Sequence, residues 1–266
     1  MQNPTDIQLR HAFAQDGAKL QDFLKPLMAL AEESPTLAVG YGLGQAGVRE
    51  SMIPYFHIVG PECELGRVRV LVVGGWTGTD TSTPLAVARL IAAVEARSPL
   101  AAGLEVTAYP LANVEAHNEG VFLTGEQSRQ GVTCWAESGC SHIRVMENEM
   151  RRYPYDAVVL LRENPRSQGA EVEAWLHDEH QRQVVSATLR ALADSDKAFR
   201  WKVNPIRPGY ARTFTPIPDA AVQPAEILVG LPGARDPVGK SDEALGLLLT
   251  VLHAFREARA AASSAR

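Results

Sequence analysis

Side chains that could do chemistry follow three apolar runs of the chain. A glycine-rich stretch after the first run contains Thr77 and Asp80, the second run ends in Arg162 and Glu163, and the third ends in Gly230. Of Thr77, Asp80 and Arg162, only Asp80 could ligate a metal ion at neutral pH, because a threonine hydroxyl is a poor neutral donor and arginine is a fixed cation. Gly230 has no side chain with which to act as an acid or a base.

Hydrophobic periodicity predicts the elements that position these residues. Strands are expected at residues 53–59, as an edge strand, and at 68–73, 104–109, 156–161, 199–203 and 226–229. Helices are expected at residues 6–33, kinked or split at Pro26, at 84–97, 141–153 and 178–194, and after an N-cap at Ser241. Residues 40–47 are interpreted as a glycine-rich link, and residues 113–140 and 205–224 as loops.

Strands that alternate with helices favour an α/β protein with three α/β/α layers and a mostly parallel, mixed central sheet. Residues 1–50 are expected to form an N-terminal helical segment that packs on the core, and residues 51–266 the α/β domain.

The strand ends resemble those of the zinc carboxypeptidases, within the superfamily of metallocarboxypeptidases and succinylglutamate desuccinylase–aspartoacylase enzymes. Residues 74–80, Gly-Gly-Trp-Thr-Gly-Thr-Asp, resemble the family's metal loop, Gly-Gly-x-His-Gly-x-Glu. Residues 109–113 look like its strand ending in Pro-x-x-Asn-Pro, residues 155–163 like the strand that ends in the last metal ligand, and residues 227–233 like the run that carries the catalytic Glu. The resemblance covers about residues 53–260 and implies a zinc-exopeptidase-like fold.

The resemblance also implies where the family's chemistry would lie. The zinc ligands would align with Thr77, Asp80 and Arg162, the catalytic Glu with Gly230, and a substrate-binding arginine with Arg129. Since a catalytic zinc needs three protein ligands, and a guanidinium would repel the metal, we expect neither zinc nor another cofactor. The favoured interpretation is a carboxypeptidase-like pseudoenzyme that binds a small anionic ligand, a peptide or a protein partner.

The vacated metal position is expected to be filled by a salt bridge between Asp80 and Arg162, with Glu163 pointing to the opposite side of its strand. The residues expected to line the ligand cleft are Trp76, Asp80, Asn113, Arg129, Arg162 and Glu163.

Two other functions stay open. One is an active metal-dependent amide or peptide hydrolase whose rearranged metal site uses Asp80, His117 or the histidines of residues 177–180. The other is a purely structural subunit whose cleft is plugged by Trp76. A thiol enzyme built on Cys134 or Cys140 is disfavoured, because the sequence places no histidine base beside either residue.

The composition predicts an ordinary soluble protein. The 266 residues are 45% hydrophobic and carry a net charge of −5, with scattered basic residues, so a nucleic-acid partner is not expected. No run approaches the roughly 20 apolar residues of a membrane helix, and the first ten residues lack a signal-peptide pattern. With three cysteines, expected to be reduced thiols, these features predict a cytoplasmic protein. Its oligomeric state stays open.

Overall fold

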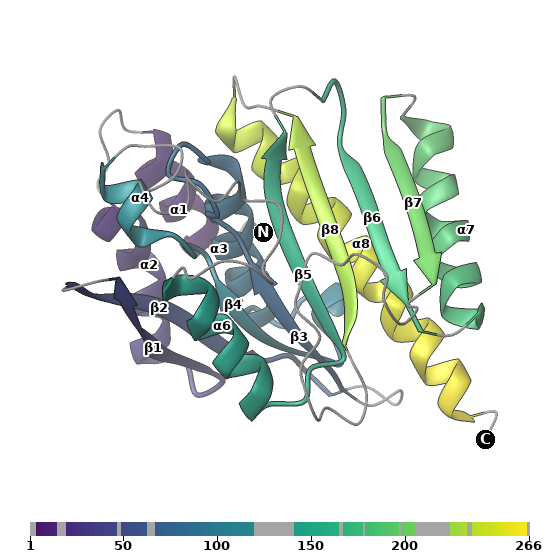
Figure 1. Cartoon of the computed structure of the whole chain (residues 1–266), viewed down its shortest axis with the longest axis horizontal. Helices are drawn as coiled ribbons and strands as arrows, with labels where there is room; N and C mark the ends of the chain where they lie inside the picture. The colour runs from purple at the N-terminus through teal and green to yellow at the C-terminus, as the bar shows by residue number, and fades with distance from the viewer. Residues whose placement is uncertain are drawn as a thin grey trace.

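The core of the protein is one eight-stranded sheet with helices on both faces, seen in a computed structural model (Figure 1). The structure describes residues 4–14, 20–46, 49–62, 67–119, 141–164, 167–177, 179–196, 198–205, 224–232 and 236–264. The strands are β1 (Leu37–Ala46), β2 (Arg49–Val59), β3 (Val68–Val73), β4 (Leu104–Tyr109), β5 (Ala157–Asn164), β6 (Glu171–Leu176), β7 (Arg200–Pro205) and β8 (Ala225–Pro232). The helices are α1 (Pro4–Ala14), α2 (Leu20–Glu33), α3 (Ser82–Glu95), α4 (Val114–Glu119), α6 (Ser141–Arg152), α7 (Glu179–Ser195) and α8 (Pro237–Ser264), with a 3-10 turn, η1 (Pro99–Ala101).

The sheet is mixed and mostly parallel, as the alternation of elements predicted. Its strand order is β1-β2-β4-β3-β5-β8-β6-β7. The pairs β3–β4, β3–β5, β5–β8 and β6–β7 are parallel, and the pairs β1–β2, β2–β4 and β6–β8 are antiparallel. The carboxyl ends of β3, β4, β5 and β8 therefore meet at one edge of the sheet, which is where α/β proteins place their ligand sites.

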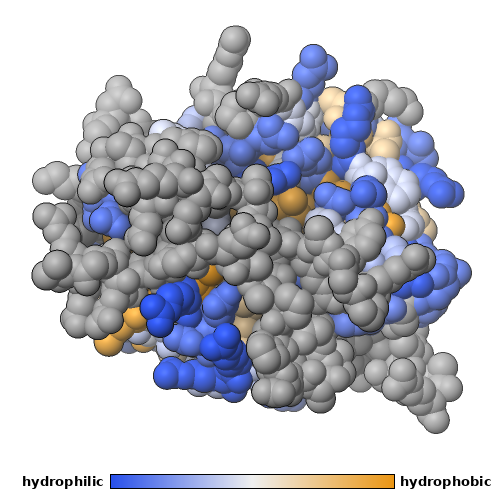
Figure 2. Space-filling model, in the orientation of Figure 1, coloured by the Kyte–Doolittle hydropathy of each residue, from blue (hydrophilic) through white to orange (hydrophobic). Residues whose placement is uncertain are grey.

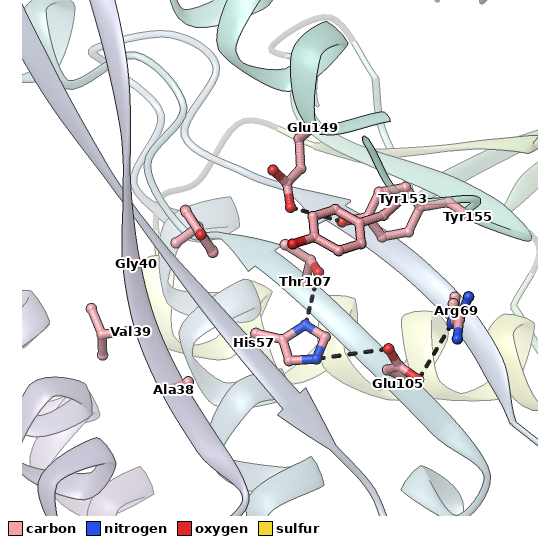
Figure 3. A pocket seen from close by; sticks show the side chains of 11 residues that line it. Ala38, Val39, Gly40, His57, Arg69, Glu105, Thr107, Glu149, Tyr153 and Tyr155 are labelled. Atoms are coloured by element: carbon pink, nitrogen blue, oxygen red, sulfur yellow. Dashed lines mark hydrogen bonds and ion pairs between the residues drawn. The ribbon is translucent and has the colours of Figure 1, made fainter. Parts of the chain in front are cut away.

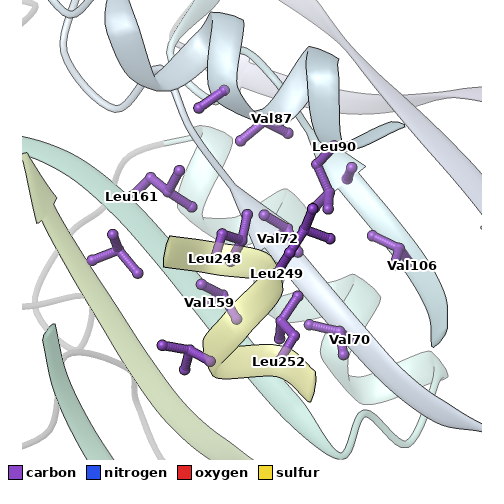
Figure 4. Packing of buried hydrophobic residues seen from close by; sticks show 14 of the residues in the cluster. Val70, Val72, Val87, Leu90, Val106, Val159, Leu161, Leu248, Leu249 and Leu252 are labelled. Carbon is purple, nitrogen blue, oxygen red and sulfur yellow. The ribbon is translucent and has the colours of Figure 1, made fainter. Parts of the chain in front are cut away.

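Both faces of the central strand β3 are buried. Val70 and Val72 pack against α3 and α8 in one apolar cluster (Figure 4), whereas Leu71 and Val73 belong to a second cluster beneath α6. A strand that is covered on both faces has a continuous apolar sequence rather than an alternating one. The bounds predicted for β3 and β4 agree with the structure.

The long helix α8 covers the sheet on the face opposite α6. Leu248, Leu252 and Phe255 on its inward side are at most 1% exposed, as the periodicity predicted. The helix begins at Pro237 rather than after Ser241, so the expected N-cap is wrong. Asp236 accepts a hydrogen bond from the backbone N–H of Gly239 at 3.0 Å, which satisfies a donor of the true first turn.

The glycine-rich residues 40–47 were expected to be a link, but they belong mainly to β1, which forms the edge of the sheet. β2, expected at the edge, lies inside it. A side chain on Gly40 would overlap the ring of Tyr55, and one on Gly42 would overlap Val145 of α6. These glycines are therefore strand residues that make room for packing above them.

The N-terminal helices pack on the core through a cluster of charges. Arg89 of α3 is 4% exposed and binds Asp6 of α1 at 2.5 Å and Asp242 of α8 at 2.6 Å. The single helix expected over residues 6–33 is instead two helices, α1 and α2, and Pro26 lies inside α2 rather than between them. None of the helices that the structure describes is long and apolar enough to cross a membrane.

Candidate functional site

The loop after β3 is joined to the loop after β4 by backbone hydrogen bonds. The N–H of Asn113 donates to the carbonyl of Gly75 at 3.0 Å, and its side-chain amide donates to the carbonyl of Trp76 at 3.3 Å. Gly75 has a φ of 60°, and a side chain there would come within 2.8 Å of the carbonyl oxygen of Pro110. The glycine is thus required by both its backbone conformation and the close approach of the second loop. Trp76 is 7% exposed and packs in the cluster beneath α6.

Asp80 is bound to the start of α3. Its carboxyl group accepts hydrogen bonds from the backbone N–H of Thr83 at 3.1 Å and from the Thr83 hydroxyl at 2.5 Å. The side chain is 1% exposed, and a carboxylate at this position is stabilised by the orphan N–H groups and the dipole of the helix. Both oxygens of Asp80 therefore serve the first turn of α3.

Glu163 reaches the same helix end from β5. One of its oxygens accepts hydrogen bonds from the backbone N–H groups of Thr81 and Ser82, at 3.3 and 3.0 Å, and from the Ser82 hydroxyl at 2.6 Å. Burial raises the pKa of Asp80 well above its ordinary value, and the negative charge of Glu163 raises it further. Two acidic groups thus share one helix terminus.

The expected salt bridge between Asp80 and Arg162 is wrong. Successive residues of a strand point to opposite faces of a sheet, so when Glu163 faces α3, Arg162 faces the other side. Arg162 is 49% exposed there and lies 3.5 Å from an oxygen of Glu171. Gly230 is the neighbour of both residues in the sheet, and a side chain on it would overlap the Glu171 carboxylate.

This open face of the sheet carries a stripe of alternating charge. Glu171 pairs in register with Arg200, and Glu173 with Lys202, whose ammonium nitrogen lies 3.3 Å from a Glu173 oxygen. Together with Arg162, they line a shallow pocket of about 150 Å³. Hydrophilic side chains also cover much of the region of β6 and β7 in Figure 2. We refer to Arg162, Glu171, Glu173, Arg200 and Lys202 as the charged stripe.

The chain is similar to a metallo-carboxypeptidase from Burkholderia cenocepacia, with a TM-score of 0.64 and 10% identity over 87% of this chain and 68% of that one. It is also similar to bovine thrombin-activatable fibrinolysis inhibitor solved with a tick carboxypeptidase inhibitor, with a TM-score of 0.63 and 9% identity over 92% and 97% of the two chains. A third is carboxypeptidase A from Helicoverpa armigera, with a TM-score of 0.62 and 13% identity over 98% and 80%.

The chain has a carboxypeptidase-like fold. The identities are too low to show more than the fold, and neither a family model nor a curated protein matches the sequence. Within this fold, Asp80 lies at the helix end on one side of the sheet and Arg162 on the other. In the part of the chain that the structure describes, no three His, Cys, Asp or Glu side chains are grouped so that they could hold a metal ion.

The structure places His117, one of the alternative metal-ligand candidates, near Glu163. Burial lowers the pKa of His117 to about 4, although the Glu163 charge partly opposes this shift. The buried Nε2 atom has no hydrogen-bond partner among the described residues. His177 and His180 are exposed near the start of α7. Arg129, Cys134 and Cys140 lie outside the described residues.

The acidic residues of the charged stripe were missed because β6 was not predicted. The sequence did contain a signal: residues 171–176 read Glu-Val-Glu-Ala-Trp-Leu, in which charged and apolar residues alternate at the period of a half-exposed strand. Val172 and Ala174 are buried under α7 and α8, so Glu171 and Glu173 face the open side.

Proposed function

We propose that the protein is a carboxypeptidase-like binding protein that holds an anionic ligand, a small carboxylate or a peptide C-terminus, on its charged stripe and does not use zinc. The observation that carries the proposal is the separation of Asp80 and Arg162. The Asp80 carboxyl group is occupied by Thr83, while Arg162 presents a half-exposed cation next to Gly230 on the other face.

The residues at the carboxyl ends of the strands do not fit a zinc ion held as in a hydrolase. Such an ion needs three protein ligands and an open position for water. Thr77 is a neutral donor, both oxygens of Asp80 face the first turn of α3, and Arg162 would add a positive charge. Gly230, at the position where the resemblance puts the catalytic Glu, has no group that could activate water.

The charged stripe has the chemistry of an anion site. Its three cations and two carboxylates leave one net positive charge, and Arg162 can bind a carboxylate through two N–H groups. The ion pair between Arg162 and Glu171 is 3.5 Å long and partly exposed, and pairs of this kind contribute only about 0 to 1 kcal/mol. A ligand carboxylate can therefore compete for Arg162 at little cost.

Thermal-shift titration with glutarate and with the peptide acetyl-Glu-Glu tests this function. We expect stabilisation of the wild-type protein that increases with ligand concentration. The Arg162→Gln variant should lose it, whereas Arg190→Gln, an exposed arginine of α7 away from the stripe, should retain it. No response of the wild-type protein, or an equal response of the Arg162→Gln variant, would contradict the proposal.

A metal-dependent amide or peptide hydrolase is the second candidate. It is favoured by one observation: His117, whose buried Nε2 atom has no hydrogen-bond partner among the described residues, lies near Glu163, and histidine and carboxylate side chains are zinc ligands. Metal analysis of protein purified without chelator separates the two functions. Stoichiometric zinc, lost together with peptide hydrolysis in an Asp80→Ala variant, would replace the first proposal by the second.

A purely structural subunit is the third function that the sequence leaves open. Trp76 is buried beneath α6, as a plugged cleft would require. In that case neither glutarate nor acetyl-Glu-Glu would stabilise the protein.

A further inference from the structure

A second pocket, with a volume of about 290 Å³, lies beneath the end of α6 (Figure 3). It is lined by Ala38, Val39, Gly40, Tyr55, His57, Arg69, Glu105, Thr107, Glu149, Tyr153 and Tyr155. Arg69 and Glu105 are at the amino ends of β3 and β4, so the pocket is at the opposite end of these strands from residues 74–80. Its volume is close to the lower limit of about 300 Å³ for ligand pockets, which suits a small molecule.

Three tyrosines form the aromatic walls of this pocket. Tyr55 belongs to β2. Tyr153 and Tyr155 follow the end of α6 (Figure 3). The ring of Tyr55 fits over β1 because Gly40 has no side chain there, and it packs against Tyr109 with ring centroids 5.4 Å apart. The faces of aromatic rings carry partial negative charge and attract cations.

Glu149 adds a buried carboxylate to the tyrosine walls. It is 8% exposed and accepts a hydrogen bond from the Tyr155 hydroxyl at 3.3 Å. No lysine, arginine or histidine of the described residues lies within salt-bridge distance of it. Burial raises the pKa of this group, although the hydrogen bond from Tyr155 and the charge of Arg152 partly oppose this shift. A buried carboxylate without a cation in direct contact is unfavourable, and a positively charged ligand would compensate it.

The opposite side of the pocket holds a second carboxylate. Glu105 lies 3.7 Å from the Nε2 atom of His57 and 3.5 Å from the Nε atom of Arg69, which is 48% exposed. In the lining, the two carboxylates of Glu105 and Glu149 outnumber the single guanidinium of Arg69. The pocket therefore differs in sign from the charged stripe, whose cations outnumber its carboxylates.

We propose that this pocket binds a small organic cation, an alkylamine or a diamine, whose ammonium group lies between the Glu149 carboxylate and the tyrosine rings. The ammonium group donates hydrogen bonds to Glu149, and its positive charge is attracted by the ring faces. The alkyl chain packs on the tyrosine rings. In a diamine, the second ammonium group approaches Glu105.

Isothermal titration of the full chain with 1,4-diaminobutane and butylamine tests the proposal. The uncharged 1,4-butanediol is the matched control ligand, because it has the chain length of the diamine without its charge. We expect both amines to bind the wild-type protein and the diol to bind at least tenfold more weakly. This comparison needs no variant and is independent of ligand binding at Arg162.

Two variants locate the site. Glu149→Gln keeps an acceptor for the Tyr155 hydroxyl and removes the charge, so it should remain folded and weaken amine binding at least tenfold. Glu147→Gln removes a charge from the same helix outside the pocket and should change binding less than twofold. Absence of amine binding to the wild-type protein, equal binding of the diol, or unchanged binding to a folded Glu149→Gln variant would each overturn the proposal.

Discussion

Replacing Glu171 by glutamine should strengthen anion binding at Arg162. In the wild-type protein, Glu171 lies 3.5 Å from the Arg162 guanidinium and is also held by the side-chain amide of Asn164 at 3.1 Å. Disrupting an exposed pair of this kind costs a ligand about 0.2 to 1 kcal/mol. The ligand carboxylate is further repelled by Glu171, by about 0.7 kcal/mol at roughly 6 Å in water. Removing both effects amounts to about 0.9 to 1.7 kcal/mol, or about 5- to 18-fold in affinity.

Isothermal titration with glutarate measures the change. Glu171→Gln should lower the Kd about 5- to 18-fold. Glu173→Gln should lower it less, because the Glu173 carboxylate pairs with Lys202. Glu32→Gln, an exposed acid of α2, controls for net charge and should leave the Kd unchanged. Weaker or unchanged glutarate binding to Glu171→Gln would refute the competition between ligand and Glu171. Loss of a peptide-hydrolysing activity in this variant would instead make Glu171 a catalytic base.

Three further substitutions test the structure around the site. Arg89→Met should lower the free energy of unfolding, measured in urea, by about 2 to 4 kcal/mol. The loss should be smaller than that of an isolated buried ion pair, because Asp6 and Asp242 also bind Arg10. A loss below about 0.5 kcal/mol would contradict a role of Arg89 in holding α1. His117 is kept neutral by a folded-state pKa of about 4, so its stabilisation is complete above its ordinary pKa of 6.5 and is lost as the pH falls towards 4. Between pH 7 and 5 the free energy of unfolding of the wild-type protein should therefore fall by up to about 2 kcal/mol more than that of the His117→Gln variant. Equal decreases in the two proteins would exclude burial of His117. Gly75→Ala should lower the thermal midpoint by several degrees, because φ is 60° and the new side chain meets Pro110; an unchanged midpoint would contradict this conformation.

The parallel centre of the sheet could be predicted because its strands are buried on both faces. Such burial selects long apolar runs, and residues 68–73 show this directly. β1 could not be recognised in the same way. Its glycines are required by the packing of Tyr55 and Val145, which are distant from them in the sequence. The glycine-rich pattern of these residues therefore indicates a link, although the fold uses them as strand residues without side chains.

The candidate site was predicted in its position but not in its contacts. The strand ends do bring Asp80, Glu163 and Arg162 to one edge of the sheet, as the order of elements implied. The predicted interaction partners were wrong, because successive side chains of a strand point to opposite faces of the sheet. Arg162 and Glu163 therefore face opposite sides, and only Glu163 can reach α3. Arg162 finds Glu171 instead, on a strand that the sequence pattern had not revealed.

Gly230 connects the fold to the chemistry of the stripe. At this position the strand has no side chain, and the space above it is occupied by Glu171 from the neighbouring strand β6. A carboxylate is therefore present close to where the resemblance to carboxypeptidases places the catalytic Glu, but it comes from another element and is bound by Arg162 and Asn164. The contact with Arg162 also makes Glu171 an internal competitor for anions. Replacing Glu171 should therefore raise the affinity of an anion-binding site, whereas it would lower the activity of a site in which Glu171 is the catalytic base.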